Sequence, residues 1–152
     1  MPPPTPSPPI RPEDVPGLAR GVIRAGKFPI LATADGDQPR LRPMTLSWEE
    51  DFTTYFVSLK RFHKTQEIAA NPKVEVCFLD EHHSQVRISG IAELVTDAAL
   101  RKKAWDRDPL IPRFLGSIDN PEFQLLRVRP TRVRYMKEWA LEYHDVPVPP
   151  GA

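Results

Sequence analysis

The fold of this chain is decided by Phe28-Pro-Ile-Leu-Ala-Thr-Ala-Asp-Gly-Asp-Gln-Pro-Arg-Leu-Arg-Pro-Met-Thr-Leu-Ser-Trp48. Its first part, 28–33, is apolar and is followed by Asp35-Gly36, a strong signal for a tight hairpin turn. Residues 38–48 form the returning strand. A polar turn then leads into 52–58, which is rich in the Thr, Tyr, Phe and Val that favour strands. Three strands joined by short turns predict an antiparallel meander.

The remainder of the chain alternates further strands with short helices. We expect a bulge or bend at Gly90, and a bulge or a sheet edge at Pro130, because each interrupts a strand pattern. Asp97 is expected to cap a helix. The pattern predicts strands over 73–79, 85–95 and 126–136, and helices over 14–25, 62–70 and 97–107, with another starting at Asn120-Pro121.

These elements predict a mainly β (α+β) fold. Six short, mostly antiparallel strands with early hairpins suggest a closed or nearly closed barrel, because closure leaves few exposed strand edges. Proline is concentrated at the ends, with eight of the 19 prolines in residues 1–16 and three in 147–150. We expect a flexible proline-rich tail over 1–12, one folded domain over 13–140 and a C-terminal tail over 141–152.

Charge and hydropathy argue against several classes of function. The formal net charge is +1, so no global field draws the protein to nucleic acid or to an anionic membrane. No apolar stretch is long enough for a membrane span and no signal peptide is evident, so we expect a cytoplasmic protein. His82-His83 has no further ligands at recognisable spacing, and no metal site is expected.

A cluster of basic residues is the most informative polar feature. Arg40 and Arg42 share one face of strand 38–48. If this strand pairs with strand 52–58, the end of strand 52–58 should lie near Arg40 and Arg42. The other members precede or open helix 62–70, whose amino end carries partial positive charge and offers N–H groups to an anion. A solvated loop and an anion site are equally good interpretations of the full set, which is Arg40, Arg42, Lys60, Arg61, His63 and Lys64.

A series of short motifs adds a further argument through its order and spacing. They are Phe28-Pro-Ile-Leu-Ala-Thr, Asp35-Gly, Pro39-Arg-Leu-Arg-Pro-Met, Tyr55-Phe-Val-Ser, His63-Lys64, Asn71-Pro72 and Ser89-Gly-Ile-Ala-Glu. The series resembles the pyridoxamine 5′-phosphate oxidase-like FMN-binding split-barrel proteins, in particular the small general-stress-protein branch. The resemblance covers about residues 14–137 and implies a six-stranded antiparallel split β-barrel with short flanking helices. It also implies a homodimer with FMN sites at the subunit interface.

The resemblance implies a role for particular residues of this chain. Arg42, His63 and Lys64 correspond to positions that hold the FMN phosphate. Trp139 corresponds to a late aromatic residue that reaches the flavin of the partner subunit. The remaining cofactor-binding positions lie beside the isoalloxazine ring or line the flavin, and they are Pro43, Met44, Thr45, Val57 and Ser58.

Three departures from the oxidase pattern limit what the resemblance implies. Ser47 stands where the oxidase has a lysine that contacts flavin, and His63 stands where it has an arginine. A histidine is a weaker phosphate ligand because it is largely neutral near pH 7. The C-terminal Arg-x-His substrate motif of the oxidase is absent, with Glu138-Trp-Ala-Leu-Glu-Tyr-His-Asp in its place. Oxidation of vitamin B6 is therefore not expected.

Three functions remain open at this point. The first is an FMN-dependent oxidoreductase acting on a small, unidentified substrate. The second keeps the fold and exchanges the cofactor for the deazaflavin F420, which some split-barrel relatives use. The third is a non-catalytic flavin-binding or stress-related protein. No side chain stands out as a general acid or base, and this fits a protein whose cofactor carries the chemistry.

Overall fold

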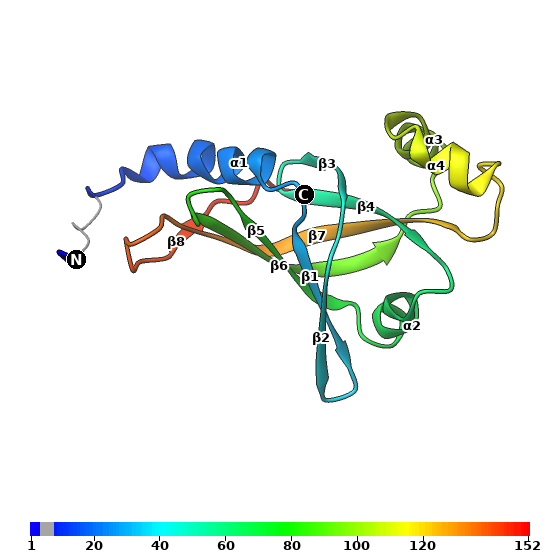
Figure 1. The fold of residues 1–152 in the computed structure, drawn as a ribbon, viewed down its shortest axis with the longest axis horizontal. Coiled ribbons are helices and arrows are strands. Elements are labelled where there is room, and N and C mark those ends of the chain that lie inside the picture. The colour runs from blue at the N-terminus through cyan, green and yellow to red at the C-terminus, as the bar shows by residue number, and fades with distance from the viewer. Residues whose placement is uncertain (4–7) are drawn as a thin grey trace.

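A computed structural model describes residues 1–3 and 8–152, so the predicted proline-rich tail falls partly on residues 4–7, outside the described part. Eight strands and four α-helices follow one another over the described residues (Figure 1). The helical elements are η1 (a 3-10 turn, Pro12–Asp14), α1 (Val15–Ala25), α2 (His63–Ala70), α3 (Ala98–Arg107) and α4 (Leu110–Leu115). The strands are β1 (Ile30–Asp35), β2 (Gln38–Pro43), β3 (Leu46–Glu50), β4 (Thr53–Leu59), β5 (Lys73–Leu79), β6 (Gln85–Leu94), β7 (Phe123–Met136) and β8 (His144–Val146).

The strands form one antiparallel sheet in the order β2-β1-β5-β6-β7-β4-β3, and β8 pairs with β7. Its two edges, β2 and β3, are consecutive in the chain and are separated by only Met44 and Thr45. The sheet is thus open in its hydrogen bonding, while one continuous segment joins its two edges. This arrangement confirms the predicted class, a mainly antiparallel split barrel with short helices.

The segment 38–48, predicted as one strand, is divided in two. β2 pairs with β1 and β3 pairs with β4, so only the second half of the segment pairs with the strand that follows it. The Met44 N–H donates to the Pro29 carbonyl at 2.8 Å, which carries the β1–β2 ladder one step beyond β2. The division, together with β8, raises the strand count from the six predicted to eight among the described residues.

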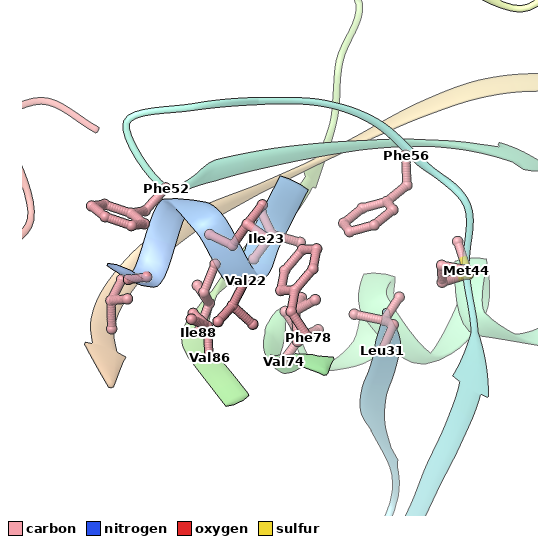
Figure 2. Close-up of a cluster of buried hydrophobic side chains, with 14 of the residues drawn as sticks. Val22, Ile23, Leu31, Met44, Phe52, Phe56, Val74, Phe78, Val86 and Ile88 are labelled. Carbon is pink, nitrogen blue, oxygen red and sulfur yellow. The ribbon is translucent and has the colours of Figure 1, made fainter. Parts of the chain in front are cut away.

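The main core fills the space between the curved sheet and α1. Val22 and Ile23 of α1 lie among Phe52, Phe56 and Phe78 from the sheet, and all five are nearly inaccessible to solvent (Figure 2). The apolar residues of α1 recur at helical spacing, so one face of the helix can cover the sheet.

A second, smaller core lies on the other face of β4, under α3 and α4. The Trp48 ring stacks on the Tyr55 ring with centroids 4.0 Å apart, and Ala104 of α3 is fully buried in the same cluster. Because β4 is covered on both faces, it does not show the burial alternation of a surface strand. α3 begins as predicted, with Asp97 Oδ1 accepting the Leu100 N–H at 2.8 Å.

The helix predicted to start at Asn120-Pro121 is wrong. Asn120 Oδ1 accepts the Glu122 N–H and Asn120 Nδ2 donates to the Leu115 carbonyl, both at 2.9 Å. The side chain therefore closes a turn instead of capping a helix, and β7 starts directly afterwards. The short helix of this region is α4, which lies earlier in the chain.

The sheet extends past residue 140, where the predicted domain ended. Residues of β8 pair with β7, with Val146 opposite Val133, and Val146 is buried in the main core. Ile10 and Val148 also pack against that core. Parts of both predicted tails thus contribute to the folded domain.

Gly90 lies at a break in the β6–β7 register, opposite Pro130, as the sequence predicted. A Cβ atom at Gly90 would lie 2.4 Å from the Arg129 carbonyl oxygen and 2.8 Å from Val128 Cγ1. Only glycine lets the two backbones approach this closely.

Gly90→Ala should therefore lower the free energy of unfolding by about 2–3 kcal/mol, because the β6–β7 backbones must separate. The matched control is Gly21→Ala on the exposed face of α1, where a Cβ meets nothing within 4 Å. That change should raise the free energy of unfolding by about 0.5–1 kcal/mol. Chemical denaturation measures both, and a stabilised Gly90→Ala variant would contradict the close approach.

Candidate functional site

A buried ion pair joins α2 to the first hairpin of the sheet. Arg42 of β2 donates through Nη2 to both carboxylate oxygens of Glu67, at 3.0 and 3.2 Å. Its Nη1 donates to Thr33 Oγ1 at 2.7 Å. The Glu67 side chain is 7% exposed and that of Arg42 is 22% exposed. Arg42 is thus brought to α2 by packing of the helix on β1 and β2, not by the predicted pairing of the whole second strand with the third.

Lys64 lies beside this pair, in the first turn of α2, and is 8% exposed. Its ammonium lies 4.3 Å from the centroid of the Phe62 ring, and it has no hydrogen bond or ion pair with any other described residue. Burial, followed by the positive charge of Arg42, lowers the pKa of Lys64, and Glu67 opposes this shift. An anion placed beside Lys64 would stabilise its charged form.

The other predicted basic residues are exposed. His63 opens α2 and lines a shallow hollow with Asp35 and Glu67. Arg40 pairs with Asp35 at 3.2 Å, and Arg61 lies 4.0 Å from Glu122. Three of the six members of the basic cluster, Arg40, Arg42 and Arg61, therefore lie beside carboxylates, and Lys64 is the buried member without an ion pair among the described residues.

A cleft of about 450 Å³ lies between the β3–β4 edge of the sheet and α4. Its walls are mainly apolar and come from Leu46, Val57 and Leu59 on one side and Leu110, Ile111 and Phe114 on the other. Its polar groups are Thr45, Ser47, Arg107 and Asp108. The cleft has the size and the mixture of apolar and polar groups that are typical of a small-molecule site.

The predicted ring-side residues divide between the cleft and the core. Thr45 and Val57 line the cleft. Met44 is buried in the main core and Pro43 is exposed at the sheet edge. Ser58, next to Val57 in β4, is buried, and its Oγ has no hydrogen-bond partner among the described residues.

Trp139 lies apart from the cleft within one chain. It is 59% exposed, has a positive φ of 61° and belongs to the loop between β7 and β8. This loop and the helices α3 and α4 lie toward opposite ends of the molecule (Figure 1). The structure therefore does not bring Trp139 to the cleft of its own chain (Figure 1).

Two residues of the site were missed by the sequence analysis. Glu67 lies one helical turn after Lys64, and that spacing could have indicated it. Arg107 ends α3, lines the cleft and donates through Nε to the Ser47 carbonyl at 3.0 Å. No local pattern indicates that contact, because α3 and β3 are brought together only by the tertiary fold.

Both the sequence and the fold have known relatives. Residues 17–137 match the family model of pyridoxamine 5′-phosphate oxidase. The chain belongs to this family. General stress protein 26 of Bacillus subtilis (strain 168) is 28% identical over 131 residues, which cover 82% of this chain and 89% of that protein.

Solved structures share the fold at lower identity. General stress protein 26 from Bacillus anthracis strain Sterne has a TM-score of 0.73 at 22% identity, covering 88% of this chain and 99% of its own. A protein of Nostoc punctiforme PCC 73102, described as pyridoxamine 5′-phosphate oxidase-related and FMN-binding, has a TM-score of 0.60 at 19% identity. It covers 88% of its own chain and 87% of this one.

Two features are absent from the described residues, 1–3 and 8–152. No group of three or more His, Cys, Asp and Glu side chains in them is placed to hold a metal ion. None of their helices is both long enough and apolar enough to cross a membrane.

Glu67→Ala should lower the free energy of unfolding by about 2–3 kcal/mol, because it leaves the largely buried Arg42 without its counter-ion. Asp35→Ala is the matched control, since it removes the partner of the exposed Arg40 and should cost less than about 1 kcal/mol. Urea denaturation of both variants gives the comparison. Equal losses of unfolding free energy in Glu67→Ala and Asp35→Ala would show that the Arg42–Glu67 pair does not hold α2 on the sheet.

Proposed function

We propose that this protein binds FMN and acts as an FMN-dependent oxidoreductase on a small substrate. The observation that carries the proposal is the continuity between the apolar cleft and the basic start of α2. Val57 and Leu59 line the cleft, and β4 leads directly from them into Lys60, Arg61, His63 and Lys64. A planar apolar ring with a phosphate at the end of a short chain matches these two parts.

The flavin ring would lie in the cleft. Leucine, isoleucine, valine and phenylalanine side chains of its two walls supply apolar contact for both faces of a ring. Thr45, Ser47 and Arg107 supply the polar groups that a ring with carbonyl and nitrogen edges requires. Pro43 and Met44 would support the same backbone segment.

The phosphate would lie at the start of α2, held by Lys64 and His63. This helix end has no side-chain cap, so its N–H groups and partial positive charge add to those of the two side chains. Arg42 would contribute its Nε–H group, while Glu67, Thr33 and the Leu31 carbonyl hold its other N–H groups in place. A phosphate also provides the counter-ion that Lys64 otherwise lacks among the described residues.

The chemistry of hydride or electron transfer would come from the flavin itself. Among the described residues that line the cleft, none is His or Cys. The one carboxylate of the lining, Asp108, accepts the Leu110 N–H at 2.9 Å and so starts α4. The side chains of the cleft would therefore bind and orient the ring and exclude water from it.

A homodimer would complete the site. Trp139 is exposed and distant from the cleft of its own chain, so a second copy would have to deliver it to the flavin. The relatives support a flavin through the Nostoc punctiforme protein, which is described as FMN-binding.

Lys64→Met should weaken FMN binding by about 10–100-fold and riboflavin binding by less than about threefold, because riboflavin lacks the phosphate. Methionine retains the apolar stem, so the buried position stays filled. Quenching of flavin fluorescence on titration measures both affinities. Lys73→Ala, an exposed lysine on β5, serves as the control and should bind both ligands as the original protein does.

If Lys64→Met loses equal affinity for FMN and for riboflavin, Lys64 is not a phosphate ligand. Binding of F420 in the absence of FMN binding would favour the deazaflavin alternative. Two further results would count against the proposed activity: bound FMN that is reduced by neither NADH nor NADPH, or reduced FMN that is not reoxidised by an added acceptor. In either case the protein is a flavin binder and the proposed activity is wrong.

A further inference from the structure

A second groove, of about 600 Å³, lies beside the cleft. The two hollows share Thr45, Leu46 and Arg107, so the β3 segment and the Arg107 side chain separate them. The groove continues from there to the end of α1 and the loop that follows it, including Lys27 and Phe28. A molecule in the groove would therefore lie next to a molecule in the cleft.

Three cations from three separate segments line this groove. Arg24 comes from α1, Lys27 from the loop before β1, and Arg107 from the end of α3. Neither Arg24 nor Lys27 has an ion pair or a side-chain hydrogen bond with a described residue. Arg107 bonds to one neutral group among the described residues, the Ser47 carbonyl.

For Arg24 and Arg107, the lack of a carboxylate partner is unusual among the arginines of the described residues. Most of the other arginines are neutralised at close range, as in the pairs Arg42–Glu67 at 3.0 Å, Arg127–Glu93 at 2.7 Å and Arg132–Asp145 at 2.8 Å. Arg24 and Arg107 stand in the last turns of their helices, where the helix dipole favours a cation. That preference accounts for the positions of Arg24 and Arg107 along their helices, and Lys27 lies two residues beyond the end of α1.

The rest of the lining is mostly apolar and includes one carboxylate. Phe28 lines the groove and is 68% exposed. The one carboxylate of the lining, Glu49, accepts the Phe52 N–H through Oε1 at 2.6 Å. Trp48, also in the lining, is 6% exposed, and its Nε1 has no hydrogen-bond partner among the described residues.

We propose that this groove binds a small organic anion, with its carboxylate or phosphate between Arg24, Lys27 and Arg107 and its apolar body against Phe28. Three uncompensated cations attract the charge, and the exposed aromatic ring supplies apolar contact. The further assignment of this anion as the substrate or electron donor of the flavin rests on the proposed function, because it depends on a flavin in the neighbouring cleft.

The binding test uses the flavin-free protein and three probes of one shape, which are benzoate, phenyl phosphate and neutral benzamide. We expect one or both anions to bind with a Kd of about 1 mM, and benzamide at least about tenfold more weakly, since it lacks the charge. Two-dimensional NMR locates the site, and the amides of Lys27 and Phe28 and the Trp48 indole N–H should shift. The stronger of the two anions identifies the charged group that the groove prefers.

The double variant Arg24→Ala and Lys27→Ala should weaken binding of the anion at least about tenfold. The matched control is Lys73→Ala with Arg113→Ala, which removes the same charge from two exposed residues outside the groove. The control should bind the anion within about twofold of the original protein.

Three results would overturn the proposal. They are no anion binding, equal binding of benzamide, or equal weakening in the control variant. Since the experiment needs no flavin, anion binding by a protein that fails to bind FMN would retain the groove and reject the proposed function.

Discussion

The structure depends on one constraint, which is that a single segment, 38–50, belongs to both edges of the sheet. Its first half is held by the β1 ladder and its second half by the β4 ladder, and buried Met44 lies between them. The segment cannot leave one edge without disturbing the other. This double attachment places Thr45 and Ser47 at the mouth of the barrel, where the cleft forms.

The distribution of charge separates structural from functional residues. Carboxylates neutralise the arginines of β7, and the buried Glu67 neutralises Arg42. Among the described residues without a carboxylate partner are the buried Lys64 and the three cations of the second groove. A buried cation such as Lys64 would gain most from an anionic ligand, while the exposed Arg24 and Lys27 would attract one through their combined charge.

Sequence predicted the parts of the fold that local chemistry determines. The strand boundaries of β5, the Asp97 cap and the bulge at Gly90 all follow from patterns a few residues long. The division of segment 38–48 into β2 and β3 could not be predicted in this way. The segment changes its pairing partner half-way along, and such a change leaves the local strand pattern intact. Asn120 can cap a helix or close a turn equally well, and only contact with Leu115 decides between them. In the candidate site, the places of Lys64 at a helix start and of Val57 on a strand could be predicted from local sequence. The contact between Arg107 and the Ser47 carbonyl could not, because the two residues are 60 positions apart in the chain.

The outer layer of β3, β4, α3 and α4 differs from the barrel in how well its polar groups are satisfied. All four buried side-chain atoms without a hydrogen bond, counted over the described residues, lie on β3 and β4: Ser47 Oγ, Trp48 Nε1, Thr54 Oγ1 and Ser58 Oγ. Each such group costs about 1–3 kcal/mol of local stability. Amide hydrogens of this layer should therefore exchange with solvent at a lower opening free energy than those of β5 and β6. The walls of the cleft should therefore be the least costly part of the sheet to open, and the double attachment of segment 38–50 limits how far they can separate.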